Sequence, residues 1–214
     1  MSLILDAVAV RLDGRLLVPP LSACVGPGEV LAVMGPSGSG KSSLLAWVAG
    51  LLQSPLQGEG VITLDGLDLG ERPAEQRRLG LMFQDDLLFP HLDVLHNLLF
   101  ALPAGPRATR IERAHEALAE AGLAGHASHH PHQLSGGQRS RVSLVRSLLA
   151  EPRALLLDEP FSKLDSALRA QMREVVWTTL RRRGLPAMLV THDVQDLPPG
   201  AQRVELTARP GTDA

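Results

Sequence analysis

A glycine-rich segment in the first quarter of the chain has the residue types and the spacing of a phosphate-binding loop. Residues 35–42 fit the pattern G-x-x-x-x-G-K-[ST], with an apolar run before them and a helix-forming segment after them. In such a loop the backbone N–H groups surround phosphates at a helix N-terminus, Lys41 neutralises the β- and γ-phosphates, and the Ser42 hydroxyl ligates Mg²⁺. The segment therefore predicts an ATP–Mg²⁺ site. Its expected nucleotide-binding residues are Gly35, Pro36, Ser37, Gly38, Ser39, Gly40, Lys41, Ser42 and Ser43.

Two acidic residues, Asp158 and Glu159, directly follow the apolar run 154–157. A carboxylate at the end of a buried strand is costly unless it meets a cation. An acidic pair of this kind often just ends a strand, but behind a phosphate loop it indicates chemistry. We expect Asp158 to hold Mg²⁺, directly or through water, and Glu159 to be the general base that orients or deprotonates the attacking water.

Four short apolar runs predict buried strands of a parallel sheet, which is apolar on both faces. The runs are 30–34, 79–83, 154–157 and 187–190. Polar residues follow each run: the phosphate loop, Gln84, the acidic pair and His192. Because ligands bind at the carboxyl ends of such strands, we expect these groups to converge on one site.

Gln84 and His192 extend the predicted chemistry. The Gln84 amide can contact both the metal and the water, and His192 can donate a hydrogen bond to the γ-phosphate. Either residue alone would more often be structural. Their positions at strand ends place Gln84 among the metal ligands and both residues, with Glu159, among the catalytic groups.

Helices and antiparallel strands fill the remaining sequence. Apolar spacing predicts helices over 42–52, 109–122, 138–150 and 166–183. The region from about 85 to 133, with loops rich in Pro, Gly and His, indicates a helical insertion into the parallel core. Residues 1–29 and 58–69 predict antiparallel strands, with turns at Asp13-Gly14 and Asp65-Gly66.

Composition limits the classes of protein that fit. The 214 residues, 44% of them hydrophobic, suit one compact domain, and the net charge of −2 offers no broad basic field for nucleic acid. The single cysteine, Cys24, cannot form an internal disulfide and fits a reducing compartment. We expect no signal peptide, and no uncharged apolar run reaches the roughly 18–20 residues that span a bilayer. A membrane role would therefore come through a partner.

The pentapeptide LSGGQ at residues 134–138 predicts a second anion-binding site. A serine and a pair of glycines open a helix there, so a hydroxyl and backbone N–H groups point at an anion. The simpler interpretation is an N-cap for the helix that follows, and both can hold together. Because this site is far from the phosphate loop in sequence, we expect it to serve the ATP of another copy. The residues concerned are Ser135, Gly136, Gly137 and Gln138.

The order of these motifs over residues 3–206 resembles that of ABC ATPase subunits. The matching stretches are GPSGSGKSS, MFQDDLLFPHLDVLHNL, PHQLSGGQRSRVSLVRSLL, ALLLDEPFSKLD and LVTHD. The resemblance implies that Gln84 is the Q-loop glutamine and His192 the switch histidine. It implies that Glu159 is the catalytic base and that Asp165, in the D-loop, lies at a dimer seam and helps to bind nucleotide.

The resemblance also implies a fold and an assembly. The fold is an α/β P-loop NTPase with a RecA-like parallel core, an N-terminal antiparallel β-subdomain and a helical subdomain inserted at about 85–150, all within one domain whose tail at 207–214 is frayed. Two copies would enclose two ATP–Mg²⁺, each between residues 35–42 of one copy and 134–138 of the other; a paralogous ATPase subunit could stand in for the second copy.

Partners follow from the same resemblance. Residues 84–97 are similar to the surface that receives a coupling helix from membrane-spanning permease subunits, and the detail is similar to bacterial importers of the thiamine, sulfate, polyamine and iron type. The implied protein is cytoplasmic and peripheral on the inner membrane, works with an external substrate-binding protein, and has no nucleic-acid partner. The transported substrate is not set by these motifs.

Two other interpretations of the function stay open. An exporter or lipoprotein-release ATPase would share the fold and the chemistry. A soluble ABC ATPase acting on DNA or ribosomes would usually add coiled coils, zinc motifs or a second set of motifs, which this sequence lacks. A small-molecule kinase is excluded mainly by LSGGQ.

Two residues depart from the family pattern, and a cluster of histidines allows two interpretations. Leu12 stands where an aromatic residue usually stacks on adenine, and Lys163 stands in the D-loop where a small residue is common. Lys163 is either a solvated surface residue or part of the nucleotide or dimer interface. Four histidines precede LSGGQ, and we interpret them as a polar loop, with a metal site as the alternative. They are His126, His129, His130 and His132.

Overall fold

The computed structural model describes residues 1–83 and 85–207. Its N-terminal part is a four-stranded antiparallel sheet with the strand order β2-β1-β4-β5. The strands are β1 (Leu3–Leu12), β2 (Arg15–Val25), β4 (Leu56–Leu64) and β5 (Leu67–Asp68). The predicted turns are confirmed: at Asp13-Gly14 and Asp65-Gly66 both residues have positive φ, between 50° and 77°, as the right-handed twist of a tight hairpin requires.

A five-stranded parallel sheet with the order β6-β7-β8-β3-β9 forms the centre of the molecule. Its strands are β3 (Val30–Met34), β6 (Leu79–Met82), β7 (Ala154–Asp158), β8 (Ala187–Val190) and β9 (Gln202–Glu205). The four predicted strands are thus confirmed, and β9 pairs in parallel with β3. Every residue of β3, β7 and β8 is buried, which is why these segments read as continuous apolar runs.

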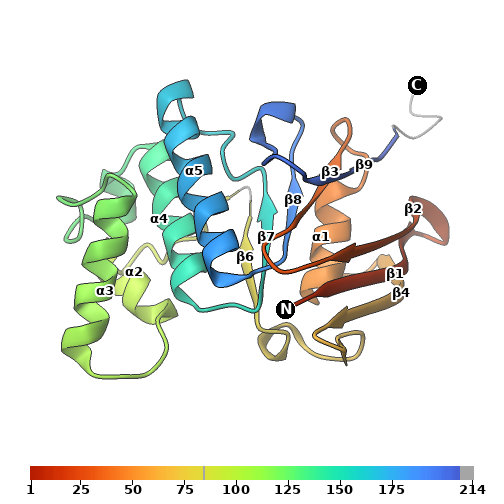
Figure 1. Cartoon of the computed structure of the whole chain (residues 1–214), viewed down its shortest axis with the longest axis horizontal. Helices are drawn as coiled ribbons and strands as arrows, with labels where there is room; N and C mark the ends of the chain where they lie inside the picture. The colour runs from red at the N-terminus through yellow and green to blue at the C-terminus, as the bar shows by residue number, and fades with distance from the viewer. Residues whose placement is uncertain (84, 208–214) are drawn as a thin grey trace.

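The described residues contain five α-helices, three of which cover the two faces of this sheet (Figure 1). The five are α1 (Lys41–Ala49), α2 (Val94–Ala101), α3 (Arg107–Glu120), α4 (Gly136–Leu149) and α5 (Ser166–Arg183). Helix α1 lies between the two sheets, whereas α4 and α5 cover the opposite face and α2 and α3 lie beyond α4.

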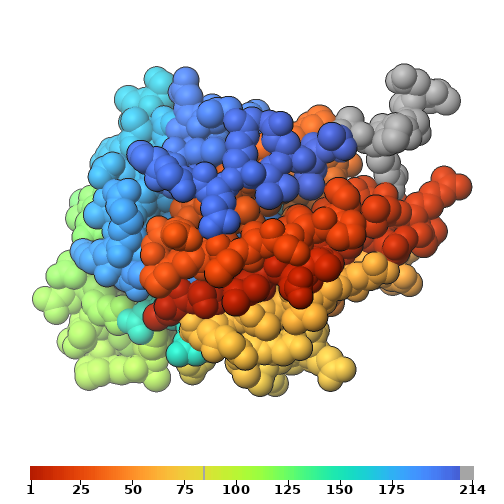
Figure 2. Space-filling model, turned by 45° about the vertical axis from the view of Figure 1, so that its right-hand side comes forward, coloured from red at the N-terminus to blue at the C-terminus, as the bar shows by residue number. Residues whose placement is uncertain are grey.

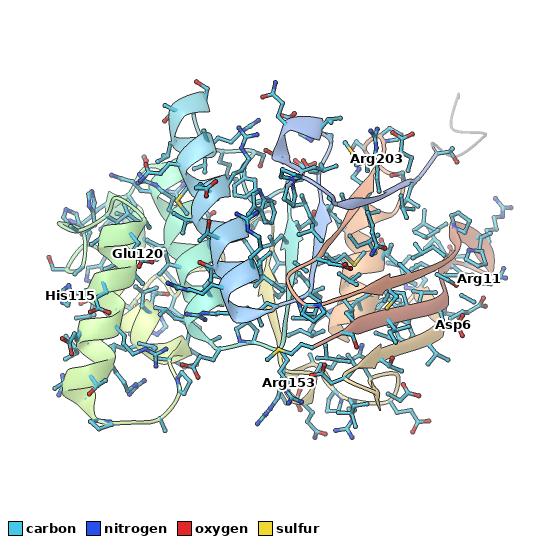
Figure 3. The ribbon with its side chains drawn as sticks, in the orientation of Figure 1. Asp6, Arg11, His115, Glu120, Arg153 and Arg203 are labelled. Atoms are coloured by element: carbon cyan, nitrogen blue, oxygen red, sulfur yellow. The ribbon has the colours of Figure 1, made fainter. Side chains whose placement is uncertain are left out.

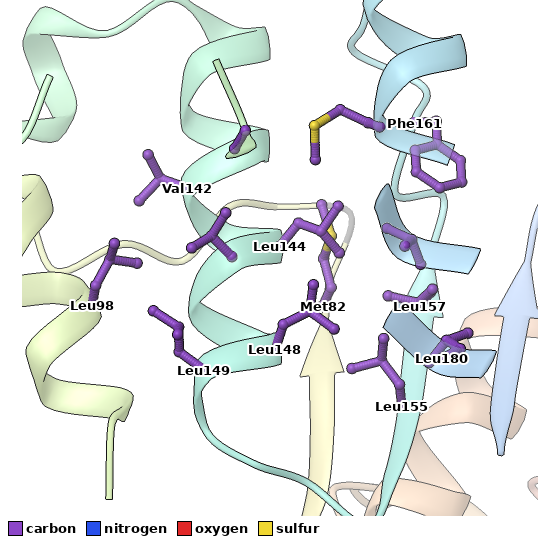
Figure 4. Close-up of a cluster of buried hydrophobic side chains, with 14 of the residues drawn as sticks. Met82, Leu98, Val142, Leu144, Leu148, Leu149, Leu155, Leu157, Phe161 and Leu180 are labelled. Atoms are coloured by element: carbon purple, nitrogen blue, oxygen red, sulfur yellow. The ribbon is translucent and has the colours of Figure 1, made fainter. Parts of the chain in front are cut away.

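Strand β7 separates two hydrophobic cores. Leu155 and Leu157 face α4 and α5, while Ala154 and Leu156 face α1 and the antiparallel sheet, because successive side chains of a strand point to opposite faces. Figure 4 shows the first core, in which leucines of α4 fill the space between α2 and strands β6 and β7. The strand ends are therefore held from both sides.

The outer parts of the molecule lie at opposite ends. His115 and Glu120 of α3 mark one end, and Asp6 and Arg11 of β1 mark the other (Figure 3). In the space-filling view, the segment that ends in β9 runs beside the N-terminal strands (Figure 2), and the Gln202 amide donates to the Cys24 carbonyl at 2.7 Å. The parallel sheet thus lies between the two ends of the molecule (Figure 1).

The limits of three predicted helices differ from the structure. Helix α4 begins at Gly136, two residues before the predicted start, because Ser135 is its N-cap; the other two are α1 and α3. Helix α1 ends at Ala49, not residue 52, because Gly50 takes φ 77° and its N–H bonds back to the last turn. Helix α3 begins at Arg107, two residues before the predicted start, because the Pro106 carbonyl accepts from the Arg110 N–H at 3.1 Å. Helix α2 is a separate element within the predicted insertion, capped by Asp93. The subdomain limits 85–150 stay a prediction, and of the tail at 207–214 only Thr207 is described.

Candidate active site

A cavity of about 630 Å³ opens where the phosphate loop meets the ends of β7 and β8. It brings together the residues predicted for three of the four strand ends. The lining residues are Leu17, Gly35, Pro36, Ser37, Gly38, Gly40, Lys41, Ser42, Ser43, Asp158, Glu159 and His192. Ser39, also predicted, is buried beneath the loop. Gln84, predicted as a metal ligand and catalytic group, lies outside the described residues.

Close packing of the loop against distant strands explains two of its glycines. Gly35 has φ 146°, and a Cβ on it would lie 2.3 Å from the Leu206 carbonyl oxygen, which follows β9. Gly40 has φ 90°, and a Cβ there would lie 2.6 Å from Cγ2 of Val18 in β2. Both positions need glycine because a side chain would be strained and would collide. The loop is therefore seated between β2 and the last strand.

Lys41 crosses back over the loop. Its Nζ donates to the carbonyl oxygens of Gly35 at 2.8 Å and Pro36 at 2.7 Å, and the residue is only 8% exposed. The first turn of α1, with its unpaired N–H groups, lies beside this ammonium. The floor of the cavity is thus a concentrated positive region that suits phosphate.

Asp158 supplies the opposite charge and is almost fully buried. Burial raises its pKa above the ordinary value of 3.8; a hydrogen bond with the Ser42 side chain and the charge of Lys41 lower that pKa, while Glu159 raises it. A hydroxyl and a buried carboxylate are hard oxygen donors, which Mg²⁺ prefers when substrate phosphates complete its shell. Ser42 and Asp158 therefore fit the predicted metal. Within the described residues no group of three or more His, Cys, Asp or Glu forms a metal site by itself.

Glu159 and His192 form a pair across the strand ends. Glu159 has φ 47° and donates its N–H to the Val190 carbonyl at 2.9 Å, so the kink after β7 turns the side chain into the cavity. Its Oε1 lies 3.0 Å from Nδ1 of His192. The His192 side chain is 66% exposed, against 19% for Glu159, so the imidazole stands at the mouth of the cavity with the carboxylate beneath it.

Residues that the sequence analysis missed hold His192 in place. Arg169 of α5 donates to Asp193 at 2.7 Å and to the Phe161 carbonyl at 3.1 Å. Buried Asp196 accepts from the Thr191 hydroxyl at 2.9 Å, and burial raises the pKa of Asp196. Nothing in the local sequence pattern marks these residues, because Arg169 and Asp193 are 24 positions apart along the chain and Asp196 lies beyond the predicted strand end.

The LSGGQ pentapeptide caps α4, as the simpler interpretation predicted. Ser135 accepts from the Gln138 N–H at 3.2 Å, and the Gln138 side chain accepts from the Ser135 N–H at 2.8 Å, which makes a reciprocal capping box. The cavity lining drawn from the described residues includes none of 134–138. Asp165 is likewise outside that lining and caps α5 by accepting from the Leu168 N–H at 3.0 Å.

The residues that depart from the family pattern also have defined positions. Leu12 pairs with Arg15 and Leu56 at the end of β1. Among the described residues that line the cavity, the large apolar side chain is that of Leu17 in β2 and not that of Leu12. Lys163 lies 3.8 Å from Asp86 and 4.0 Å from Asp85.

The histidines before LSGGQ form two ring pairs. The centroids of His126 and His129 are 5.1 Å apart and those of His130 and His132 are 5.7 Å apart. Nε2 of His126 lies 2.9 Å from the Gln138 amide nitrogen.

Across residues 1–83 and 85–207, no helix combines the length and the apolar character needed to cross a bilayer.

Asp158→Asn tests the energetic cost of the buried carboxylate. Because its native pKa is raised, the native state favours the neutral acid, and ionisation at neutral pH opposes folding. We expect urea denaturation at pH 7 to show the variant more stable by about 0.5–2 kcal/mol. This difference should grow as the pH rises from 3.8 through the native pKa and vanish below 3.8. The exposed control Glu112→Gln should change little, and a less stable Asp158→Asn protein at pH 7 would contradict the argument.

Comparison with known proteins agrees with this geometry. A family model described as ABC transporter matches residues 18–162. The Escherichia coli K12 protein named Uncharacterized ABC transporter ATP-binding protein YnjD is 44% identical over 89% of this chain and 88% of its own length. Taurine import ATP-binding protein TauB of Pseudomonas entomophila is 47% identical over 82% of this chain. Putrescine transport ATP-binding protein PotG of E. coli K12 is 42% identical over 92% of it.

The shared lengths differ among these relatives, and solved structures support the fold. The chain spans 66% of TauB and 52% of PotG. A dimeric structure of MJ0796, a bacterial ABC transporter cassette, matches 97% of the chain and 94% of its own with a TM-score of 0.83 and 28% identity. A dimeric MJ0796 structure bound to ADP and Pi matches 96% and 94% with a TM-score of 0.82 and 29% identity. The chain therefore belongs to the ABC transporter family, among its ATP-binding ATPase subunits.

Proposed function

We propose that this chain drives a bacterial importer by hydrolysing ATP in a dimer, with each ATP enclosed by two copies. One observation carries the proposal: the cavity contains the phosphate loop, Asp158, Glu159 and His192, whereas the described lining contains nothing from 134–138. A single copy therefore offers half of the predicted site. The dimeric state of the MJ0796 structures and the import named for TauB support this assembly.

The residues of one cavity divide the chemistry. The backbone N–H groups of the loop and Lys41 bind the β- and γ-phosphates. Ser42 and Asp158, with Gln84, would hold Mg²⁺, which when bound neutralises charge on the phosphates. Glu159 orients the attacking water and accepts its proton, and His192 donates to the γ-phosphate. The 3.0 Å contact between Glu159 and His192 keeps base and donor together at the mouth of the site.

The second half of each site would come from α4 of the partner copy. Ser135 and the backbone N–H groups of Gly136 and Gly137 lie at the start of a 14-residue helix, where the helix dipole favours an anion. Gln138 fixes this turn through the capping box. Asp165, which caps α5, would line the seam between the copies.

A groove fits the predicted permease contact. Leu87 and Phe89, both within the predicted surface 84–97, line a cavity of about 310 Å³ together with Phe100. Phe100 is 71% exposed and Leu87 is 56% exposed. Neighbouring large apolar side chains that are exposed to this extent often mark a surface that binds another protein. We place a helix of the membrane subunit here, with the chain on the cytoplasmic side and a substrate-binding protein outside.

Glu159→Gln tests the assignment of the base. The amide keeps the shape of the side chain but cannot accept a proton, so we expect kcat to fall by about 10²- to 10⁴-fold. ATP should still bind, and a dimer should accumulate in size-exclusion chromatography with ATP and Mg²⁺. The exposed control Glu174→Gln should keep full turnover. Robust hydrolysis by the Glu159→Gln protein would remove Glu159 from this role.

Mixing two inactive variants tests whether the site is shared between copies. Lys41→Met disables the phosphate loop. Gly136→Glu places a carboxylate at the α4 N-terminus, where the nearest atom to a Cβ is Nη2 of Arg139 at 3.9 Å, an ordinary van der Waals contact. In a mixed dimer one site carries both changes and the other carries neither. We expect an equal mixture to recover roughly a quarter of the original ATPase rate, since half of the dimers are mixed and each has one intact site. A mixture that stays inactive would show that each copy completes its own site.

Phe100→Glu tests the importer assignment and the groove together. Proteoliposomes are prepared with the membrane subunits that co-purify with this chain, and ATP-dependent movement of solute is measured in both directions. We expect uptake into the compartment that corresponds to the cytoplasm, and at least a tenfold lower affinity of the variant for the membrane subunits, because a buried unpaired charge costs more than 1.4 kcal/mol. Val61→Glu, on the exposed face of β4, should have no such effect. Outward transport would contradict the importer.

A further inference from the structure

Asp86, next in sequence to the groove residue Leu87, has a nearly buried carboxylate. The Asp86 side chain is 9% exposed, and its Oδ1 accepts no hydrogen bond from the described residues. Two cations from different elements hold it by charge: Nζ of Lys163 lies 3.8 Å from Oδ1, and Nε of Arg139 in α4 lies 3.4 Å from Oδ2. Moving this carboxylate away from both cations would leave a buried charge uncompensated.

The backbone around Asp86 is attached to the groove. Arg146 of α4 donates to the carbonyl oxygens of Leu87 at 2.9 Å and Asp86 at 3.4 Å. Its guanidinium also lies 5.8 Å from the centre of the Phe89 ring, which in turn contacts Phe100 edge-on at 4.8 Å. A partner that displaces Phe89 or Phe100 would therefore also displace the segment 85–89.

Lys163 connects this segment to the loop that carries the catalytic base. The Ser162 hydroxyl donates to the Glu159 carbonyl at 2.9 Å, and Arg169 donates to the Phe161 carbonyl at 3.1 Å, so the loop 159–165 is fixed at its cavity end. At its other end the Lys163 carbonyl oxygen lies 3.3 Å from where a Cβ on Gly137 would stand. One side chain thus joins the groove segment to a loop that touches the cavity and the LSGGQ turn.

We propose that Lys163 is a positioning residue that couples the groove segment 85–89 to the loop 159–165, so that occupation of the groove alters hydrolysis through the Asp86–Lys163 ion pair. The inference rests on the proposed function, since the groove is the proposed permease seat. The coupling has a contiguous route from the Phe89 ring through the Arg146 guanidinium to the backbone carbonyl of Asp86. It continues from the Asp86 carboxylate to the Lys163 ammonium and the loop 159–165. The Lys163 side chain is 36% exposed, so it has room to follow Asp86 when the segment 85–89 moves. In this way a displacement of that segment reaches the loop 159–165.

A double-mutant cycle on the isolated chain tests the coupling. Phe89→Ala changes the groove end, and Lys163→Met removes the ammonium; kcat and KM for ATP are measured for each variant and for the pair. We expect the effect of Phe89→Ala on kcat to shrink by about two- to tenfold in the Lys163→Met background, with KM for ATP changed by less than about twofold. Lys163→Arg, which keeps the charge, should restore the original effect. Equal effects of Phe89→Ala in both backgrounds, including no effect in either, would overturn the proposal.

A matched ion pair elsewhere provides the control. Arg113 pairs with Glu151 at 2.6 Å with a side chain 34% exposed, but it belongs to neither the groove nor the cavity. Arg113→Met combined with Phe89→Ala should therefore be additive. Thermal denaturation of every variant separates coupling from a loss of folded protein. This cycle needs no membrane subunit, so its result is independent of the transport assay. Additive effects of Phe89→Ala and Lys163→Met would contradict the coupling role of Lys163 but not the importer assignment. Outward transport would contradict the importer assignment but not the coupling role.

Discussion

Coverage of both faces of the parallel sheet is the constraint on which the rest of the structure depends. Strand β7 is apolar toward α1 on one face and toward α4 and α5 on the other, so its polar chemistry has to emerge at the carboxyl edge. Asp158, Glu159 and His192 all stand at that edge, beside the phosphate loop. The same burial makes the edge costly to occupy, since it raises the pKa of Asp158. The ionised Asp158 side chain therefore lowers the stability of the folded chain, but it provides a carboxylate that can bind a cation.

The sequence predicted what depends on local pattern. The four central strands, helix α5 with its Gly184 end and both Asp-Gly turns follow from apolar runs, capping and left-handed turn residues, and the structure has them all. Helix ends were less predictable, because Gly50 and Pro106 act through hydrogen bonds that compete with helical spacing. The order of the motifs along the chain also predicted the family correctly, because loops at the carboxyl ends of parallel strands meet at one edge of the sheet.

Contacts between distant segments could not be read from the sequence. The apolar wall of the cavity comes from Leu17 and not from Leu12, because the register of β2 against the phosphate loop depends on how Val18 packs on Gly40. The support of His192 by Arg169 and Asp193 joins α5 to a loop beyond β8. The ion pairs of Lys163 cross from one strand end to the next. Each needs the strand order β6-β7-β8-β3-β9, which spacing along the chain does not reveal.

The packing of Gly35 against Leu206 has a consequence for how the protein is made. A phosphate loop encoded near the start of the chain takes its shape against a carbonyl oxygen more than 160 residues later, and the Leu206 N–H bonds to Met34, the residue just before the loop. Because a ribosome releases the N-terminal part first, α1 and the loop leave it well before β9 does. A nascent chain stopped short of its last strand would present the nucleotide motif without the wall that shapes it. Competence to bind nucleotide should therefore arise late in synthesis.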